Sequence, residues 1–109
     1  MSANDVPQVN ERSTAYLSVT FRDKTQQPSM PVSASYRVHD QSTGQQIRAA
    51  TTLAPAESVE ITLTPADNTI LSPSKAFEAH VVTVEALYGA EDAHREQFVY
   101  QVRNLQVIA

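Results

Sequence analysis

The sequence has no cysteine and only two glycines, Gly44 and Gly89, among its 109 residues. Without cysteine the chain has no thiolate nucleophile, no disulfide and no cysteine ligand for zinc or an iron–sulfur cluster. Two isolated glycines cannot form a glycine-rich phosphate loop, and no serine has the flanking glycines of a hydrolase nucleophile turn. These absences exclude several common classes of catalytic site.

Long apolar runs and an excess of basic residues are also absent. No apolar run approaches the roughly eighteen residues of a membrane-spanning helix, and residues 1–5 have neither the basic nor the apolar part of a signal peptide. Eight basic side chains against twelve acidic ones give a formal net charge of −4, not the basic surface that binds nucleic acid. We therefore expect synthesis in the cytoplasm and no nucleic-acid or membrane partner.

The composition present is that of one globular domain, with 41% hydrophobic and 18% charged residues. A chain of this length hides about two-thirds of the surface that it exposes when unfolded, which suffices for one core without metal or disulfides. Residues 1–11 are polar and are predicted to form a flexible N-terminal arm. The folded domain is then expected to cover residues 12–109.

Apolar and polar residues alternate in several segments, which is typical of strands with one buried face. Twelve valines and ten threonines support this prediction, since β-branched side chains fit a pleated sheet. The predicted strands are residues 15–22, 32–39, 46–53, 57–63, 76–88 and 94–103. The side chains expected to face the core are Ala15, Leu17, Val19, Phe21, Val32, Ala34, Tyr36, Val38, Ile47, Ala49, Val59, Ile61, Leu63, Val82, Val84, Ala86, Tyr88, Phe98, Tyr100 and Val102.

Turn residues predict the connections between these strands. Residues 40–45 are expected to form a hairpin turn in which Gly44 adopts a positive φ, and residues 89–93 a second hairpin. Thr64 as N-cap and Pro65 at the first helical position predict one short turn of helix over residues 65–71. Ile70 and Leu71 would then close one end of the fold.

Six strands, with no helix long enough to connect parallel strands, predict an all-β fold. The expected architecture is an antiparallel β-sandwich of the immunoglobulin or fibronectin type III kind, with one short helical turn. A small Greek-key barrel is the alternative.

Three histidines, His39, His80 and His94, are the candidate metal ligands. A zinc or iron site takes two or three histidines with a carboxylate at one point. His80 and His94 could face each other across the last hairpin, near Glu78 or Glu96. No ligand spacing supports a metal, however, and we expect all three histidines to be solvated at the surface.

Acidic pairs are the remaining candidates for catalysis, since two carboxylates can serve a glycosidase. We expect these pairs to lie on solvated strand faces or at a loop tip. No twelve-residue calcium loop is present, so Asp67, Asn68 and Asp92 are assigned capping and turn roles. No catalytic, cofactor-binding or metal-binding residue is predicted, and the chain is not expected to be an enzyme. The pairs are Glu57 with Glu60, Glu78 with Glu85, and Glu91 with Asp92.

Exposed tyrosines would favour a different function, the binding of sugar rings. Tyr36, Tyr88 and Tyr100 have the inward parity, and only Tyr16 is expected to point outward. A single ring makes a poor sugar platform. A secreted or host-made carbohydrate-binding module nevertheless stays as the alternative function.

Open sheet edges are the surface on which we expect partners to bind, because an edge strand can accept a strand from another chain. Arg48 and Arg103 are interpreted as charges that keep other strands from pairing with these edges. The polar segment 2–11 and the apolar segment 105–109 are candidate docking segments. The alternative is that the first is disordered and the second packs on its own sheet.

Five stretches of the sequence resemble a group of small proteins from tailed bacteriophages and prophages. The resemblance spans about residues 16–105 and rests on strand and turn patterns, which specify a fold family better than an activity. The stretches are Tyr16–Asp23 (YLSVTFRD), Ser35–Asp40 (SYRVHD), Ile61–Asn68 (ITLTPADN), Val81–Gly89 (VVTVEALYG) and Phe98–Leu105 (FVYQVRNL).

The resemblance implies a virion structural protein. Its place would be the head–tail connection (the neck), or it would be an immunoglobulin-like module on the capsid or tail. The implied partners are portal, adaptor, capsid or tail subunits and other copies of this chain. The resemblance supplies no catalytic residues and no cofactor.

Overall fold

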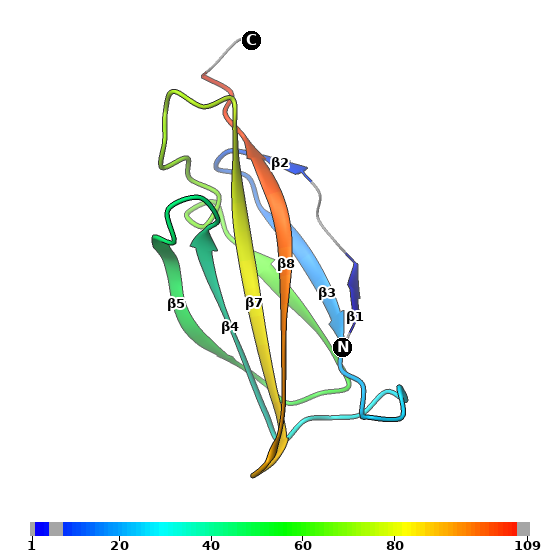
Figure 1. The fold of residues 1–109 in the computed structure, drawn as a ribbon. Coiled ribbons are helices and arrows are strands. Elements are labelled where there is room, and N and C mark those ends of the chain that lie inside the picture. Colours follow the sequence, from blue (N-terminus) through cyan, green and yellow to red (C-terminus); the bar gives the residue numbers. More distant parts are fainter. Residues whose placement is uncertain (1, 5–7, 107–109) are drawn as a thin grey trace.

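The computed structural model describes residues 2–4 and 8–106, and these residues form strands joined by turns, without a helix (Figure 1). The predicted all-β class is therefore confirmed. The strands are β1 (Ser2–Asn4), β2 (Gln8–Asn10), β3 (Ala15–Thr20), β4 (Ser33–Asp40), β5 (Gln46–Leu53), β6 (Ser58–Leu63), β7 (Phe77–Gly89) and β8 (Asp92–Arg103).

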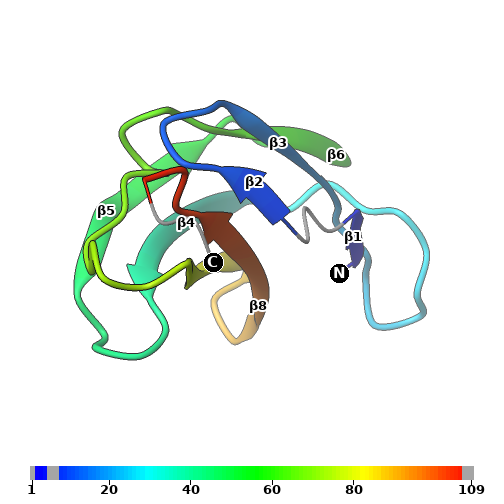
Figure 2. The same ribbon diagram turned by 90° about the horizontal axis from the view of Figure 1, so that it is seen from above.

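The strands form two separate sheets that lie in two layers, as Figure 2 shows from above. One sheet has three strands in the order β1-β3-β6, and the other has five in the order β2-β8-β7-β4-β5. All pairings are antiparallel except that between β2 and β8. The buried side chains of both sheets form a single core cluster, so the described residues form a β-sandwich rather than a closed barrel.

The alternation of polarity explains why β3 and β6 pair as they do. Leu17 and Val19 are at most 2% exposed, and they lie opposite Ile61 and Val59 of β6. Each fully buried side chain of this size stabilises the fold by about 1.5–3 kcal/mol. Because a slip by one residue would turn this apolar set to solvent, burial fixes the register.

Two residues of the predicted inward set face solvent instead. Val32 is 71% exposed because β4 begins only at Ser33. Ala49 is exposed because β5 contains a bulge: Thr51 lies opposite Tyr36 and Arg48 opposite Val38, so β5 has one more residue than β4 in this interval. The extra residue changes which side chains of β5 face the core.

Parts of the segment 1–11, predicted as a flexible arm, are hydrogen-bonded strands. Residues 2–4 pair with β3 and residues 8–10 pair with β8. The physical reason is that β3 and β8 would otherwise present unpaired backbone groups at that side of the sandwich. Residues 1 and 5–7 of the predicted arm lie outside the described residues.

The predicted helix over residues 65–71 is a single turn instead. The cap exists, because the Thr64 N–H donates to Asp67 Oδ2 at 2.9 Å and the Asp67 N–H donates to Thr64 Oγ1 at 3.3 Å. The turn does not continue, because the N–H groups of Leu71 and Ser72 donate to the carboxylate of Glu78 and not to preceding carbonyls.

The two predicted hairpins are present. Gly44 has a φ of 74°, as expected for the turn between β4 and β5. The β7–β8 hairpin pairs Gly89 with Asp92, and its tip lies at the bottom of Figure 1, below the rest of the chain. The sandwich is elongated, with extents of 47 × 21 × 20 Å.

Candidate functional site

The three histidines lie in different environments and form no common site. His39 is half-buried on β4, and the Nε2 atom of His94 lies 3.0 Å from Asp92 Oδ1 near the hairpin tip. His80 is fully buried and lies opposite Tyr100, not opposite His94. Among residues 2–4 and 8–106, no group of three or more His, Asp or Glu side chains is placed to hold a metal ion. The prediction of solvated histidines is therefore wrong for His80.

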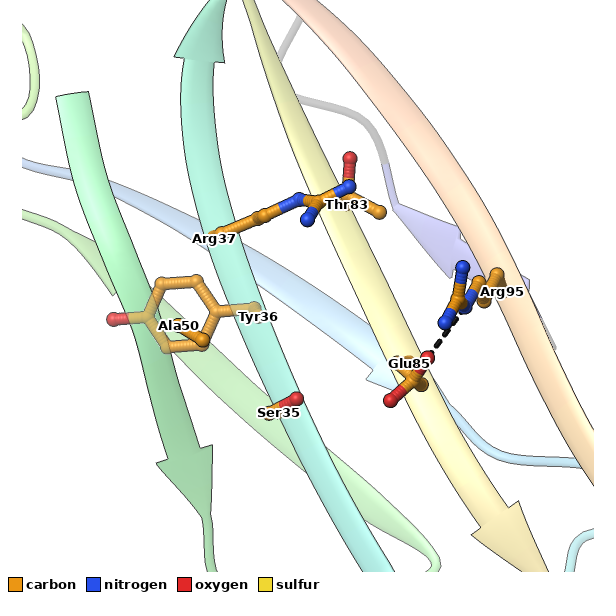
Figure 3. A pocket seen from close by; sticks show the side chains of 7 residues that line it. All are labelled: Ser35, Tyr36, Arg37, Ala50, Thr83, Glu85 and Arg95. Atoms are coloured by element: carbon orange, nitrogen blue, oxygen red, sulfur yellow. Dashed lines mark hydrogen bonds and ion pairs between the residues drawn. The ribbon is translucent and has the colours of Figure 1, made fainter. Parts of the chain in front are cut away.

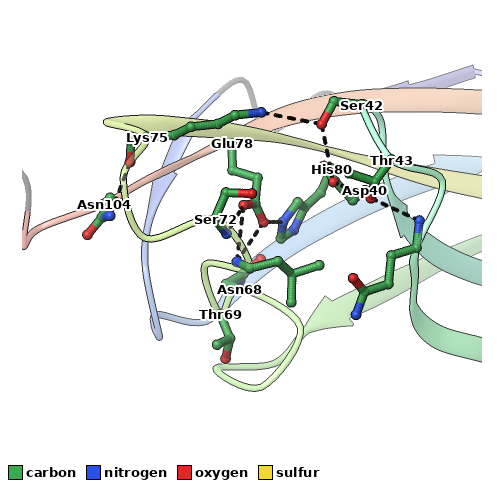
Figure 4. A network of polar contacts seen from close by, with 12 residues as sticks. Asp40, Ser42, Thr43, Asn68, Thr69, Ser72, Lys75, Glu78, His80 and Asn104 are labelled. Atoms are coloured by element: carbon green, nitrogen blue, oxygen red, sulfur yellow. Dashed lines mark hydrogen bonds and ion pairs between the residues drawn. The ribbon is translucent and has the colours of Figure 1, made fainter.

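A buried polar network surrounds His80 at one end of the sandwich (Figure 4). The carboxylate of Glu78, only 2% exposed, accepts the N–H of Leu71 at 3.0 Å and that of Ser72 at 2.8 Å. Its Oε1 atom lies 2.7 Å from His80 Nε2. The prediction that Glu78 is solvated is wrong, because this carboxylate holds the loop before β7.

The network continues through an aromatic hydroxyl. The O–H of Tyr100 donates to Asn68 Oδ1 at 2.8 Å, and His80 Nδ1 lies 3.5 Å from the same hydroxyl. Asn68 Nδ2 donates to the carbonyl of Ser13 at 2.7 Å. Burial raises the pKa of Tyr100. The network ties β7 and β8 to two loops, and its four side chains belong to residues that are at most 3% exposed.

Asp67 and Arg48 form an ion pair at the same end of the molecule. Arg48 Nε lies 2.8 Å from Asp67 Oδ1, and this hydrogen bond raises the pKa of Arg48 despite partial burial. Arg48 lies on the edge strand β5, as the prediction requires. Arg103 does not lie on an edge, because β8 lies between β2 and β7. Asp92, in the distant hairpin, does not join Asp67.

Of the other acidic residues in the predicted pairs, four are exposed and one is half-buried. Glu57, Glu60, Glu91 and Asp92 are exposed, which confirms their predicted solvation. Glu85 is half-buried and forms an ion pair with Arg95.

The tyrosines follow the predicted parity. Tyr36 and Tyr100 are buried, Tyr88 is partly buried against the core, and Tyr16 is 57% exposed. One aromatic ring is therefore presented on the outer side of the three-stranded sheet.

The outer face of the five-stranded sheet carries a shallow groove, drawn in Figure 3. The groove has a volume of about 150 Å³. Arg37 extends from β4 over β7, and Arg95 on β8 pairs with Glu85. No histidine lines it, and its one carboxylate, that of Glu85, is paired with Arg95. The lining residues are Ser35, Tyr36, Arg37, Ala50, Thr83, Glu85 and Arg95.

Apolar and cationic side chains share this outer face. Val99 and Phe77 are each 45% exposed, and Arg103 lies directly opposite Phe77. Neither lysine of the chain lies on these strands. Exposed aromatic and arginine side chains with few lysines are the composition of protein–protein interfaces. Arg37, Arg95 and Arg103 all have the outward parity in the sequence pattern, but only the strand order brings them onto one face.

Among the described residues, β5 and β6 are the edge strands of the two sheets on the side of the sandwich away from β2. β5 is bulged, whereas β6 pairs regularly with β3 over all its six residues. Of the predicted docking segment 105–109, Leu105 is 52% exposed and its N–H donates to Glu11 Oε1 at 3.0 Å. Residues 107–109 lie outside the described residues.

Comparison of the sequence with protein-family models and with curated proteins finds no match. In the described part of the chain, no helix is long and apolar enough to cross a membrane.

Proposed function

We propose that this chain is a structural protein of a tailed-phage virion that acts through protein–protein contacts. The observation that carries the proposal is the outer face of the five-stranded sheet, where Arg37, Arg95 and Arg103 accompany exposed Val99 and Phe77. The hollows on this face are open rather than enclosed: the groove has a volume of about 150 Å³, and a wider depression beside Arg37 and Arg95 has about 480 Å³. A flat surface of this composition suits another protein.

The proposed fold family is that of immunoglobulin and fibronectin type III domains. The strand order supports it, because a three-stranded sheet β1-β3-β6 packs on a sheet that contains β8-β7-β4-β5. The N-terminal segment contributes a strand to each sheet, with β1 in the three-stranded sheet and β2 in the five-stranded sheet. Such modules present sheet faces and edges to partners without any catalytic group.

The proposed location is the head–tail connection, or the surface of the capsid or tail. The proposed partners are portal, adaptor, capsid or tail subunits and copies of the chain itself. In a symmetric particle, many weak contacts add through multivalency. A formal net charge of −4 would keep free copies soluble in the host cytoplasm before assembly.

The test is to purify particles of the phage or prophage that encodes this chain. Mass spectrometry is expected to find the chain in a fixed ratio to the major capsid protein, and cryo-electron microscopy to show a matching β-sandwich at the neck, capsid or tail. Infectious particles with full assembly yield from which the chain is absent would overturn the proposal.

Carbohydrate binding is the second candidate, and one observation favours it: the exposed ring of Tyr16. If this candidate is correct, the protein binds sugars on a glycan array and Tyr16→Ala abolishes the signal. Tyr88→Phe is the control, because Tyr88 packs against the core. A silent array, or a signal that Tyr16→Ala leaves intact, removes this candidate.

A further inference from the structure

The two outer faces of the sandwich differ in charge. On the five-stranded sheet, Arg37, Arg95 and Arg103 lie beside two carboxylates, Glu85 and Glu96. Glu85 is already paired with Arg95. We call this surface the basic face. It is basic although the whole chain has a formal net charge of −4.

The outer face of the three-stranded sheet has the opposite character. On β3 and β6 its side chains include one carboxylate, that of Glu60, and no basic residue, and Arg22 follows β3 at the edge of this face. Tyr16 is the one large apolar group on it, 57% exposed. We call this surface the acidic face, and its residues on β3 and β6 are Tyr16, Ser18, Thr20, Ser58, Glu60 and Thr62.

We propose that copies of this chain associate head to tail, with the acidic face of one copy on the basic face of the next. Tyr16 of one copy occupies the groove bounded by Arg37 and Arg95 of the other. Glu60 of the first copy pairs with Arg37. The inference rests on the proposed function, in which copies of the chain contact one another in the particle.

The spacing of the groups on each face supports this contact. Arg37 and Arg95 come from β4 and β8, which lie on either side of β7, so their strands are about 9.5 Å apart. Arg37 extends over β7 and Arg95 pairs with Glu85, so a phenol ring that enters the groove is attracted to either guanidinium by a cation–π interaction. Tyr16 lies opposite Thr62 and Ser18 opposite Glu60. Tyr16 and Glu60 are therefore diagonal neighbours, about 7–8 Å apart.

Charge also argues against the competing contacts. Two basic faces or two acidic faces would place like charges opposite each other. Antiparallel pairing of two β6 edges, which are regular and unguarded by a bulge, would bring the Glu60 side chains of two copies close together. A heterologous contact avoids both problems. Because each copy retains one free face of each kind, association continues into a ring or a filament.

The first test is sedimentation velocity of the wild-type protein over a range of concentrations. The weight-average mass is expected to rise with concentration at about 0.01 M ionic strength, where the screening length is about 30 Å. It is expected to fall at about 1 M, where that length is about 3 Å. A protein that stays monomeric at millimolar concentration and low salt overturns the inference.

Single variants then identify the faces. Arg37→Glu removes the basic face and Tyr16→Ala the anchor of the acidic face, and each is expected to weaken association by roughly tenfold or more. Lys24→Glu and Val32→Ala are matched controls, because both residues are exposed outside the two faces and should leave association unchanged. Thermal unfolding checks that every variant is folded.

Mixing the two single variants gives the most specific test of the proposed contact. Arg37→Glu keeps an intact acidic face and Tyr16→Ala keeps an intact basic face, so an equimolar mixture is expected to form a 1:1 heterodimer and nothing larger. The double variant Arg37→Glu/Glu60→Arg restores opposite charges and is expected to self-associate again. Oligomers that persist in both single variants, or a mixture that stays monomeric, overturn the inference. A chain found in virions but monomeric alone leaves the proposed function standing and removes only this contact.

Discussion

His80 Nε2 lies 2.7 Å from Glu78 Oε1, and the two side chains are 0% and 1% exposed to solvent. Both residues belong to β7 and lie two positions apart, so they project on the same face of the strand. The pair joins the end of the sheet to the preceding loop, because the same carboxylate binds the backbone of Leu71 and Ser72. A buried glutamate that contacts a buried histidine thus fixes the loop that precedes β7.

Loss of the Glu78 carboxylate should destabilise the fold strongly. Glu78→Ala leaves the imidazole of His80 and the N–H groups of Leu71 and Ser72 without their acceptor, and removing one partner of a buried pair costs about 3–5 kcal/mol. Urea unfolding measures this loss. Glu60→Ala on the exposed face is the control and should stay within about 0.5 kcal/mol. If Glu78→Ala also changes the free energy of unfolding by no more than about 0.5 kcal/mol, the network contributes nothing to stability.

The hydroxyl of Tyr100 should give the fold a dependence on alkaline pH. Burial raises the pKa of Tyr100 above its unfolded value of about 10, so its contribution to stability is complete below pH 10 and decreases as the pH rises above it. Tyr100→Phe removes this contribution and also leaves Asn68 Oδ1 without its donor, at a cost of about 1–3 kcal/mol.

The measurement for Tyr100 is the free energy of unfolding between pH 8 and pH 12. Tyr100→Phe should be less stable at pH 8 and should lose less stability towards pH 12. Burial also raises the pKa of Tyr88, so part of the dependence is expected to remain. Tyr16→Phe, at a solvent-exposed position, should follow the wild type. Parallel curves for wild type and Tyr100→Phe would contradict the prediction.

Alternation of polarity was enough to predict most of the sandwich. It placed Leu17 and Val19 in β3, and Val84 in β7, at buried positions because burial on one face of a strand imposes a period of two. Applied further towards the start of β7, the same rule would have placed His80 and Glu78 inside the sandwich. We predicted both at the surface because isolated polar residues are usually solvated. Their mutual hydrogen bond removes that preference.

Other features depended on partners distant in the sequence. The capping contacts at Thr64 were visible locally, but no helix follows the turn because Glu78 takes the N–H groups of Leu71 and Ser72. The bulge that exposes Ala49 follows from pairing between β4 and β5, which composition does not specify. The basic face could be anticipated only once strand order had placed Arg37 and Arg95 on either side of β7.

Asp40 should make the fold sensitive to acid. Burial opposes ionisation, but hydrogen bonds from Thr43 at 2.7 Å and Ser42 at 3.2 Å outweigh it and lower the pKa of Asp40. A lowered pKa means that the stabilisation is present above the unfolded value of about 3.9 and is lost as the pH falls through the folded value.

Unfolding measured from pH 6 down to pH 2 tests this contribution of Asp40. Asp40→Asn should be less stable than the wild type at pH 6, and the difference should shrink towards pH 2. Glu91→Gln removes one charge at the exposed hairpin tip and serves as the control. A difference between Asp40→Asn and wild type that stays constant over the whole range would contradict the prediction.

The two glycines offer a matched test of backbone conformation. A Cβ atom at either Gly44 or Gly89 would meet no heavy atom within 4 Å, so neither substitution creates a clash. Only Gly44 has a positive φ, 74°, a region that costs an L-residue about 1–2 kcal/mol. Gly44→Ala should therefore lower the free energy of unfolding by about that amount, whereas Gly89→Ala should change it by less than about 0.5 kcal/mol. Equal effects of the two substitutions in urea unfolding would show that the turn after Asp40 does not require the left-handed conformation.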